Sequence, residues 1–151
     1  MRILGAILVL VFVVGTATAR KIGYWPYSKL VEKSDFVAVV EVGSITNAED
    51  LFTGHGDTRR FQGRIASLKV GWVIKGEPTA ETRFLFFTYS AAGQAEPDGA
   101  WFISFDEPDK HQYLVFLKRE GDKLIPVTGH YDAQISVKVL KQDLSSRIEN
   151  R

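Results

Sequence analysis

The chain has 151 residues, with 19 Lys and Arg against 18 Asp and Glu, and it contains no cysteine. A near-neutral charge disfavours nucleic acid as a partner, because phosphate backbones select basic surfaces. Without cysteine there are no disulfides to offset a thin core. Stability must therefore come from packing, and the aromatic residues, 12% of the chain, are its expected source.

Residues 1–19 have the three parts of a signal peptide. A basic start at Arg2 precedes an apolar run over residues 3–14 and a small-residue site that ends at Ala19. This order predicts cleavage after Ala19 and a periplasmic or extracellular protein. The run is shorter than the roughly 20 apolar residues of a membrane span, so an uncleaved anchor is the less favoured alternative. Loss of Arg2 would leave 18 basic residues against 18 acidic ones.

The remainder is expected to form one domain, residues 20–141, followed by a polar tail, residues 142–151. Tyr27, Leu30 and Val31 have helical spacing after a proline, which predicts a short helix near the start of the domain. The polar tail is expected to be either a short frayed helix or disordered.

Alternating apolar and polar residues predict strands through the rest of the domain. The expected strands are residues 35–42, 61–74, 83–89, 101–105, 112–117, 124–127 and 135–139. Residues 43–58 and 90–99 are expected to be loops. The predicted fold class is mainly β: a small closed or partly open antiparallel barrel of OB-like type, with little helix.

Parity within two of these strands predicts which side chains face the core. Ala66, Leu68, Val70, Trp72 and Ile74 share one side of the second expected strand, so Trp72 is expected inside. The last strand is expected to place Ile135, Val137 and Val139 inward, with Ser136 and Lys138 facing solvent.

Four segments resemble the netrin-like domains, a group that includes the tissue inhibitors of metalloproteinases and many bacterial exported proteins. They are SDFVAVVEV (34–42), VGWVIKG (70–76), YLVFL (113–117) and PVTG (126–129). The resemblance implies a five-stranded OB-type barrel with a flanking helix. Inhibitors of that group ligate a protease zinc through an N-terminal cysteine. Here the processed chain would begin at Arg20, so that chemistry has no residue to carry it.

No motif for catalysis or metal binding emerges. The three histidines, His55, His111 and His130, lie near acidic residues but lack the short spacings of zinc ligands. The acidic stretches 96–99 and 106–109 lack the spacing of a calcium loop, and no G-x-S-x-G elbow is present. Carboxylate pairs of glycosidase type depend on tertiary distances and stay open. The sequence therefore predicts no catalytic residue, no metal and no cofactor.

The expected function is that of an exported non-catalytic binding module whose partner is another exported or envelope protein. The alternative is an inhibitor of an extracytoplasmic peptidase that acts through loops and the mature N-terminus, and an enzyme is third. Tyr24, Trp25 and Tyr27 suit either a helical lid or an interface. Convergence of the Arg20 end and both loops on one rim would favour the inhibitor. The candidate interaction surface comprises Arg20, Tyr24, Trp25, His55, Asp57, Glu96 and Asp98.

Overall fold

Six strands and one short α-helix make up the described part of the chain. The computed structural model describes residues 23–53, 60–79, 81–89, 99–105 and 111–140. The elements are α1 (Tyr27–Lys33), β1 (Phe36–Thr53), β2 (Arg60–Lys75), β3 (Thr82–Thr88), β4 (Gln112–Glu120), β5 (Lys123–Pro126), the 3-10 turn η2 (Ala133–Ser136) and β6 (Val137–Leu140). The predicted mainly-β class is confirmed. The expected C-terminal tail lies outside the described residues.

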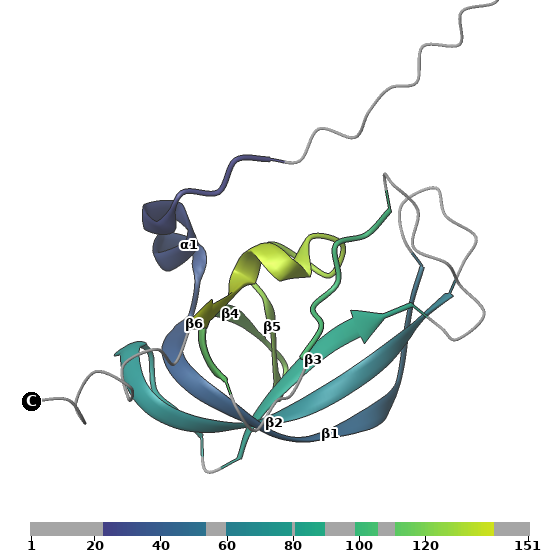
Figure 1. The fold of residues 1–151 in the computed structure, drawn as a ribbon, viewed down its shortest axis with the longest axis horizontal. Coiled ribbons are helices and arrows are strands. Elements are labelled where there is room, and N and C mark those ends of the chain that lie inside the picture. The colour runs from purple at the N-terminus through teal and green to yellow at the C-terminus, as the bar shows by residue number, and fades with distance from the viewer. Residues whose placement is uncertain (1–22, 54–59, 80, 90–98, 106–110, 141–151) are drawn as a thin grey trace, which may run out of the picture.

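Five of the strands close into a ring (Figure 1). β1 pairs with β2 along one edge and with β4 along the other, and β3 and β5 complete the circuit. The β3–β5 contact is parallel and has a single residue pair, Phe84 opposite Leu124. β6 adds to β4 outside the ring. The predicted partly open barrel is confirmed, and β3–β5 is its one parallel pairing among the described strands.

The stretch expected to be a loop after residue 42 is largely strand, because β1 runs on to Thr53. Its polar residues Ser44, Thr46, Asn47 and Glu49 are exposed, while Ile45 packs against the barrel core. Glycine allows a close approach here: a Cβ at Gly43 would lie 2.6 Å from the Ser67 hydroxyl. The predicted loop was wrong here because a solvent-exposed strand face and a loop have similar polar composition.

Trp72 faces solvent and not the core. Val39 pairs with Trp72 whereas Val40 pairs with Val70, so Gly71 is an extra residue in β2. Such a bulge reverses the parity of the residues that follow it. Trp72 is therefore 73% exposed, and Val73 packs against the core in its place. Ile74, also expected inside, is exposed.

The barrel interior is an aliphatic and aromatic core. Phe84 stacks on Phe86 with ring centroids 5.6 Å apart. Phe105 meets Phe86 edge-on at 5.2 Å and Tyr113 at 5.0 Å, which closes the core from the side of the 99–105 segment. That segment was expected to contain a strand, but residues 101–105 join no ladder of the described strands. Its apolar alternation serves core packing.

A second core covers the outer face of β2, β3 and β5. Phe61, Leu85, Phe87 and Ile125 are buried there beneath Tyr89, Phe102 and Tyr131. β3 is thus buried on both faces, as its doubly apolar sequence predicts. Phe84 and Phe86, which alternate with Leu85 and Phe87 along β3, point the other way, into the barrel.

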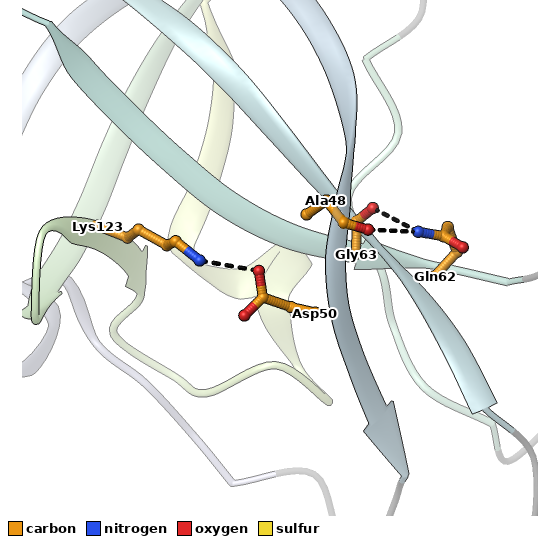
Figure 2. A network of polar contacts seen from close by, with 5 residues as sticks. All are labelled: Ala48, Asp50, Gln62, Gly63 and Lys123. Carbon is orange, nitrogen blue, oxygen red and sulfur yellow. Dashed lines mark hydrogen bonds and ion pairs between the residues drawn. The ribbon is translucent and has the colours of Figure 1, made fainter.

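Polar contacts hold the second half of β1, residues 43–53 and here called the β1 arm, beside this second core (Figure 2). The Gln62 amide donates to the carbonyls of Ala48 and Gly63, at 2.8 and 3.1 Å. Lys123 Nζ lies 2.8 Å from the Asp50 carboxylate and so joins β5 to β1. A Cβ at Gly63 would lie 2.5 Å from the Asp50 carbonyl oxygen, so glycine is what lets the two strands approach.

The C-terminal strand begins later than its pattern predicts. Ile135 and Ser136 belong to η2, and β6 starts at Val137. Ser136 is fully buried, and its hydroxyl bonds that of Thr128 at 2.7 Å. Val139 is 57% exposed. The expected outward position of Ser136 is therefore wrong, because the 3-10 turn interrupts the period-two alternation and a neighbouring hydroxyl satisfies the buried serine. Val139 pairs with Tyr113 and so shares the face of the barrel core, but it is exposed because β6 lies at the end of the strand order.

Candidate functional site

α1 follows Tyr24 and Trp25 and packs as a lid on the outer face of β1 and β4. Leu30 is buried with Val37 and Phe116, and Trp25 packs against this cluster. Lys29 Nζ lies 4.3 Å from the Trp25 ring centroid. Lys75, at the end of β2, donates to the Val31 carbonyl at 2.8 Å and fixes the last turn of the helix.

Two of the residues that the sequence suggested for interaction can be placed. Trp25 serves the lid, whereas Tyr24 is 85% exposed. The others lie outside the described residues; they are Arg20, His55, Asp57, Glu96 and Asp98.

α1 and the place where β1 and β2 meet at Thr53 and Arg60, here called the tip, lie at opposite ends of β2. Residues 54–59 join Thr53 to Arg60, and Gln62 pairs with Thr88 just before residues 90–98. Both segments therefore begin at the Arg60 end of β2. α1 lies at the Lys75 end, and Figure 1 shows α1 and the β1–β2 tip on opposite sides of the barrel. Tyr24 and Trp25 accordingly lie far from the tip.

A hollow of about 610 Å³, here called the edge hollow, lies beside β6. It draws its lining from α1, the 99–105 segment, η2 and β6. The lining residues are Tyr27, Trp101, Gln134, Ile135, Val137, Lys138 and Val139.

The edge hollow lies along the edge of β6 and not over one face of the sheet. Val137, Lys138 and Val139 all line it, yet consecutive residues of a strand point to opposite faces. Only a position along the strand's edge is reached by all three. β6 is the last strand in the sheet order, and among the described strands it pairs with β4 alone.

Trp101 stands at the junction of the edge hollow and a second one. The second hollow has a volume of about 320 Å³, is lined by residues 100–104 and the end of β3, and shares Trp101 and Gln134 with the first. Trp101 donates its backbone N–H to Tyr131 at 2.8 Å and accepts from the Gln134 N–H at 3.0 Å. Its indole is 44% exposed on a backbone that is held on both sides.

The chemistry of the edge hollow favours an apolar group together with an anion. Its described walls are mainly aromatic and aliphatic, with Gln134 as an amide and Lys138 as the only charged residue among the described lining residues. Such a mixture, apolar walls with a few placed polar groups, is typical of ligand sites.

A third hollow, lined by described residues of β1, β2 and β3, has a different character. Its volume is about 460 Å³, and it lies on the outer face of β1, β2 and β3 among serine and threonine hydroxyls, Glu81 and Arg83. The hydroxyls of Ser44 and Ser67 lie 3.2 Å apart and bond each other. Both charge signs are present, so this hollow has no preferred ligand charge. The edge hollow is therefore the stronger candidate.

The histidine that the structure places most clearly is part of the packing. The His130 ring meets Phe87 edge-on at 4.6 Å. Burial lowers the pKa of His130 below its ordinary value; Lys118 adds to this, while Glu120 and Asp50 oppose it. The hydrogen bond from Lys123 lowers the pKa of Asp50. No group of three metal-ligating side chains occurs in the part of the chain that the structure describes.

None of the described helices is long and apolar enough to cross a membrane. Sequence reasoning missed Trp101, Gln134 and Lys138 as site residues, because it assigned Trp101 to a strand and Lys138 to a solvent-facing position. Nothing in the sequence could have marked them, since the free edge of β6 is a property of the strand order.

Comparison of this chain with protein-family models, with curated proteins and with solved structures found no match. The netrin-like resemblance therefore stays a prediction.

Proposed function

We propose that the protein is an exported, non-catalytic binding module that uses the edge hollow as its ligand surface. The observation that carries the proposal is Trp101, a half-exposed indole on a fixed backbone where two hollows meet. The export part rests on the leader-like residues 1–19.

Exposed apolar side chains at one site supply a driving force for binding. Tyr27, Trp101 and Val139 are all substantially exposed within the lining of the edge hollow. Covering apolar surface releases roughly 25 cal/mol per Å², and aromatic anchors dominate many interfaces. Because the Trp101 backbone is already held by two hydrogen bonds, little ordering is needed on binding.

The test compares two exposed tryptophans. Protein purified from expression of the full chain is probed against an array of random twelve-residue peptides as wild type, as Trp101→Ala and as Trp72→Ala. Trp72 is the matched control because it is exposed on β2 and does not line the edge hollow. Selected peptides should lose about tenfold or more in affinity with Trp101→Ala and keep it with Trp72→Ala. Equal binding by all three proteins, or no selection at all, would contradict the proposal.

Export is tested on the same preparation. Expression in a bacterium with an intact secretion pathway should yield an extracytoplasmic protein whose mass lacks residues 1–19 and whose N-terminus is Arg20. A cytoplasmic protein that retains Met1 would contradict this part. The peptidase-inhibitor alternative depends on residues outside the described ranges, and no described contact favours it.

A further inference from the structure

We propose that the ligand of the edge hollow is an extended peptide segment with an acidic side chain, which adds to the free edge of β6 as a further strand. This inference rests on the proposed function and specifies its partner.

The first argument is the position of the edge hollow. It is lined by three consecutive residues, Val137, Lys138 and Val139, and so lies along an edge whose only described strand partner is on the other side. An edge strand presents unpaired backbone N–H and C=O groups, which an incoming strand can pair. Recognition by strand addition uses such an edge with adjoining side-chain pockets.

The second argument is that apolar side chains flank this edge on both faces. Val139 pairs with Tyr113 and Val137 with Val115, so both valines lie on the face of the barrel core. Lys138 pairs with Leu114, which packs with Ile135 in the cluster under α1. Successive side chains of an added strand would alternate between these two faces.

The third argument is charge. Among the described residues, Lys138 is the only charged one in the lining of the edge hollow, and its ammonium forms no ion pair with any of them. An acidic side chain on the incoming segment would complement Lys138, whereas a basic one would be repelled.

The experiment uses three blocked seven-residue peptides in which valine alternates with glutamate, glutamine or lysine. Binding is measured by titration, and amide shifts are followed by NMR on the protein from full-chain expression. The glutamate peptide should bind about tenfold tighter than the lysine peptide and shift the amides of Val137–Leu140. N-methylation of the alternate peptide nitrogens that face β6 should cost roughly three- to tenfold per lost hydrogen bond, while methylation of the other set should have little effect.

Lys138→Glu should reverse the charge preference, and Lys69→Glu is its matched control. Lys69 is exposed on β2, pairs with Glu41 and does not line the edge hollow. Circular dichroism establishes that each variant is folded.

The outcomes separate this inference from the proposed function. Peptide binding that requires Trp101 but tolerates both methylation patterns, or shows no charge preference, would overturn strand addition and leave the binding module standing. Binding that is indifferent to Trp101 would overturn both. A wild-type dimer that Lys138→Glu disrupts would show that a second copy of the chain occupies the edge, and would overturn the acidic-peptide partner.

Discussion

The two sides of the barrel are held together by different means. On one side β1 is flanked by strands along both edges, and its ladder with β2 extends from Val37 to Thr53. On the other side, here called the seam, β3 meets β5 through a single residue pair, and the non-strand segment 99–105 fills the space. The ladder side satisfies its backbone mainly by strand pairing that bulges interrupt, whereas the seam depends on single hydrogen bonds such as Trp101 to Tyr131.

This difference shows where a small barrel can place a binding surface. Regular ladders leave few unpaired backbone groups and little irregular surface. The seam supplies both, because Trp101 lies in it and the free edge of β6 borders it. Stability is therefore expected to lie mainly with the ladder side, and ligand recognition with the seam.

The largest loss of stability is expected from a substitution that leaves a cavity in the barrel interior. Phe84→Ala removes a fully buried ring that stacks on Phe86, and should cost about 3–5 kcal/mol of unfolding free energy. The comparison variant is Phe102→Ala in the seam, where the ring is only partly buried against Phe61 at 4.8 Å. Urea unfolding should show the smaller loss for Phe102→Ala. Equal losses would contradict the division between the two sides.

A smaller loss is expected at the turn after β2. Gly76 has a φ of 83°, and a Cβ there would run into the carbonyl oxygen of Asp35. Gly76→Ala should therefore cost about 2–3 kcal/mol. Gly121→Ala is the matched control, because its φ is also positive, at 61°, but no atom lies within 4 Å of the added Cβ. Its cost should be about 1 kcal/mol, measured by the same unfolding experiment. Similar costs would show that the Asp35 contact relaxes freely.

Acidification should lower the stability of the folded protein through protonation of His130. Because burial lowers the pKa of His130 in the folded protein, the unfolded chain takes up the proton first as the pH falls below about 6.5. The contribution of neutral His130 to the free energy of unfolding is therefore full above that pH. It is lost as the pH falls through the pKa that His130 has in the folded protein. Urea midpoints at pH 7.5 and 5.0 should therefore differ more for the wild type than for His130→Gln. An unchanged pH dependence in the variant would assign the effect elsewhere.

The smallest effect is expected from the ion pair between β1 and β5. Both side chains of the Asp50–Lys123 pair are partly exposed, so water screens their attraction. A double-mutant cycle with Asp50→Asn and Lys123→Met should give a coupling energy below about 1 kcal/mol. A larger coupling would mean that the pair, and not the ladder, holds the β1 arm in place.

The sequence predicts strands well where burial on one or both faces forces a pattern. β3 and β4 match their expected positions because apolar residues on both faces leave little ambiguity. The Gly43–Thr53 half of β1 was missed, since its exposed face has loop-like composition. Ile103 and Phe105 alternate with polar or exposed residues as in a strand, yet they pack in the barrel core without a ladder. The local pattern of apolar residues indicates which side chains are buried. Whether such a segment is a strand depends on its hydrogen bonding to a neighbouring strand, which the local pattern does not contain.

The candidate site was beyond sequence reasoning for a related reason. Its residues come from α1, residue 101, η2 and β6, which are separated along the chain and share no motif. Tyr24 and Trp25 were singled out because aromatic residues cluster there. The cluster serves chiefly as a lid, with Trp25 inside and Tyr24 outside.

The bulge at Gly71 lets one inserted residue set which side chains face water at the end of β2. Deletion of Gly71 would leave Trp72 directly after Val70, so simple alternation would keep Trp72 opposite Val39 on the outer face and Val73 opposite Ala38 on the core face. The Trp72 indole would therefore stay in water and keep the red-shifted fluorescence of an exposed tryptophan, and an equal emission maximum in the wild type and the deletion variant would show it.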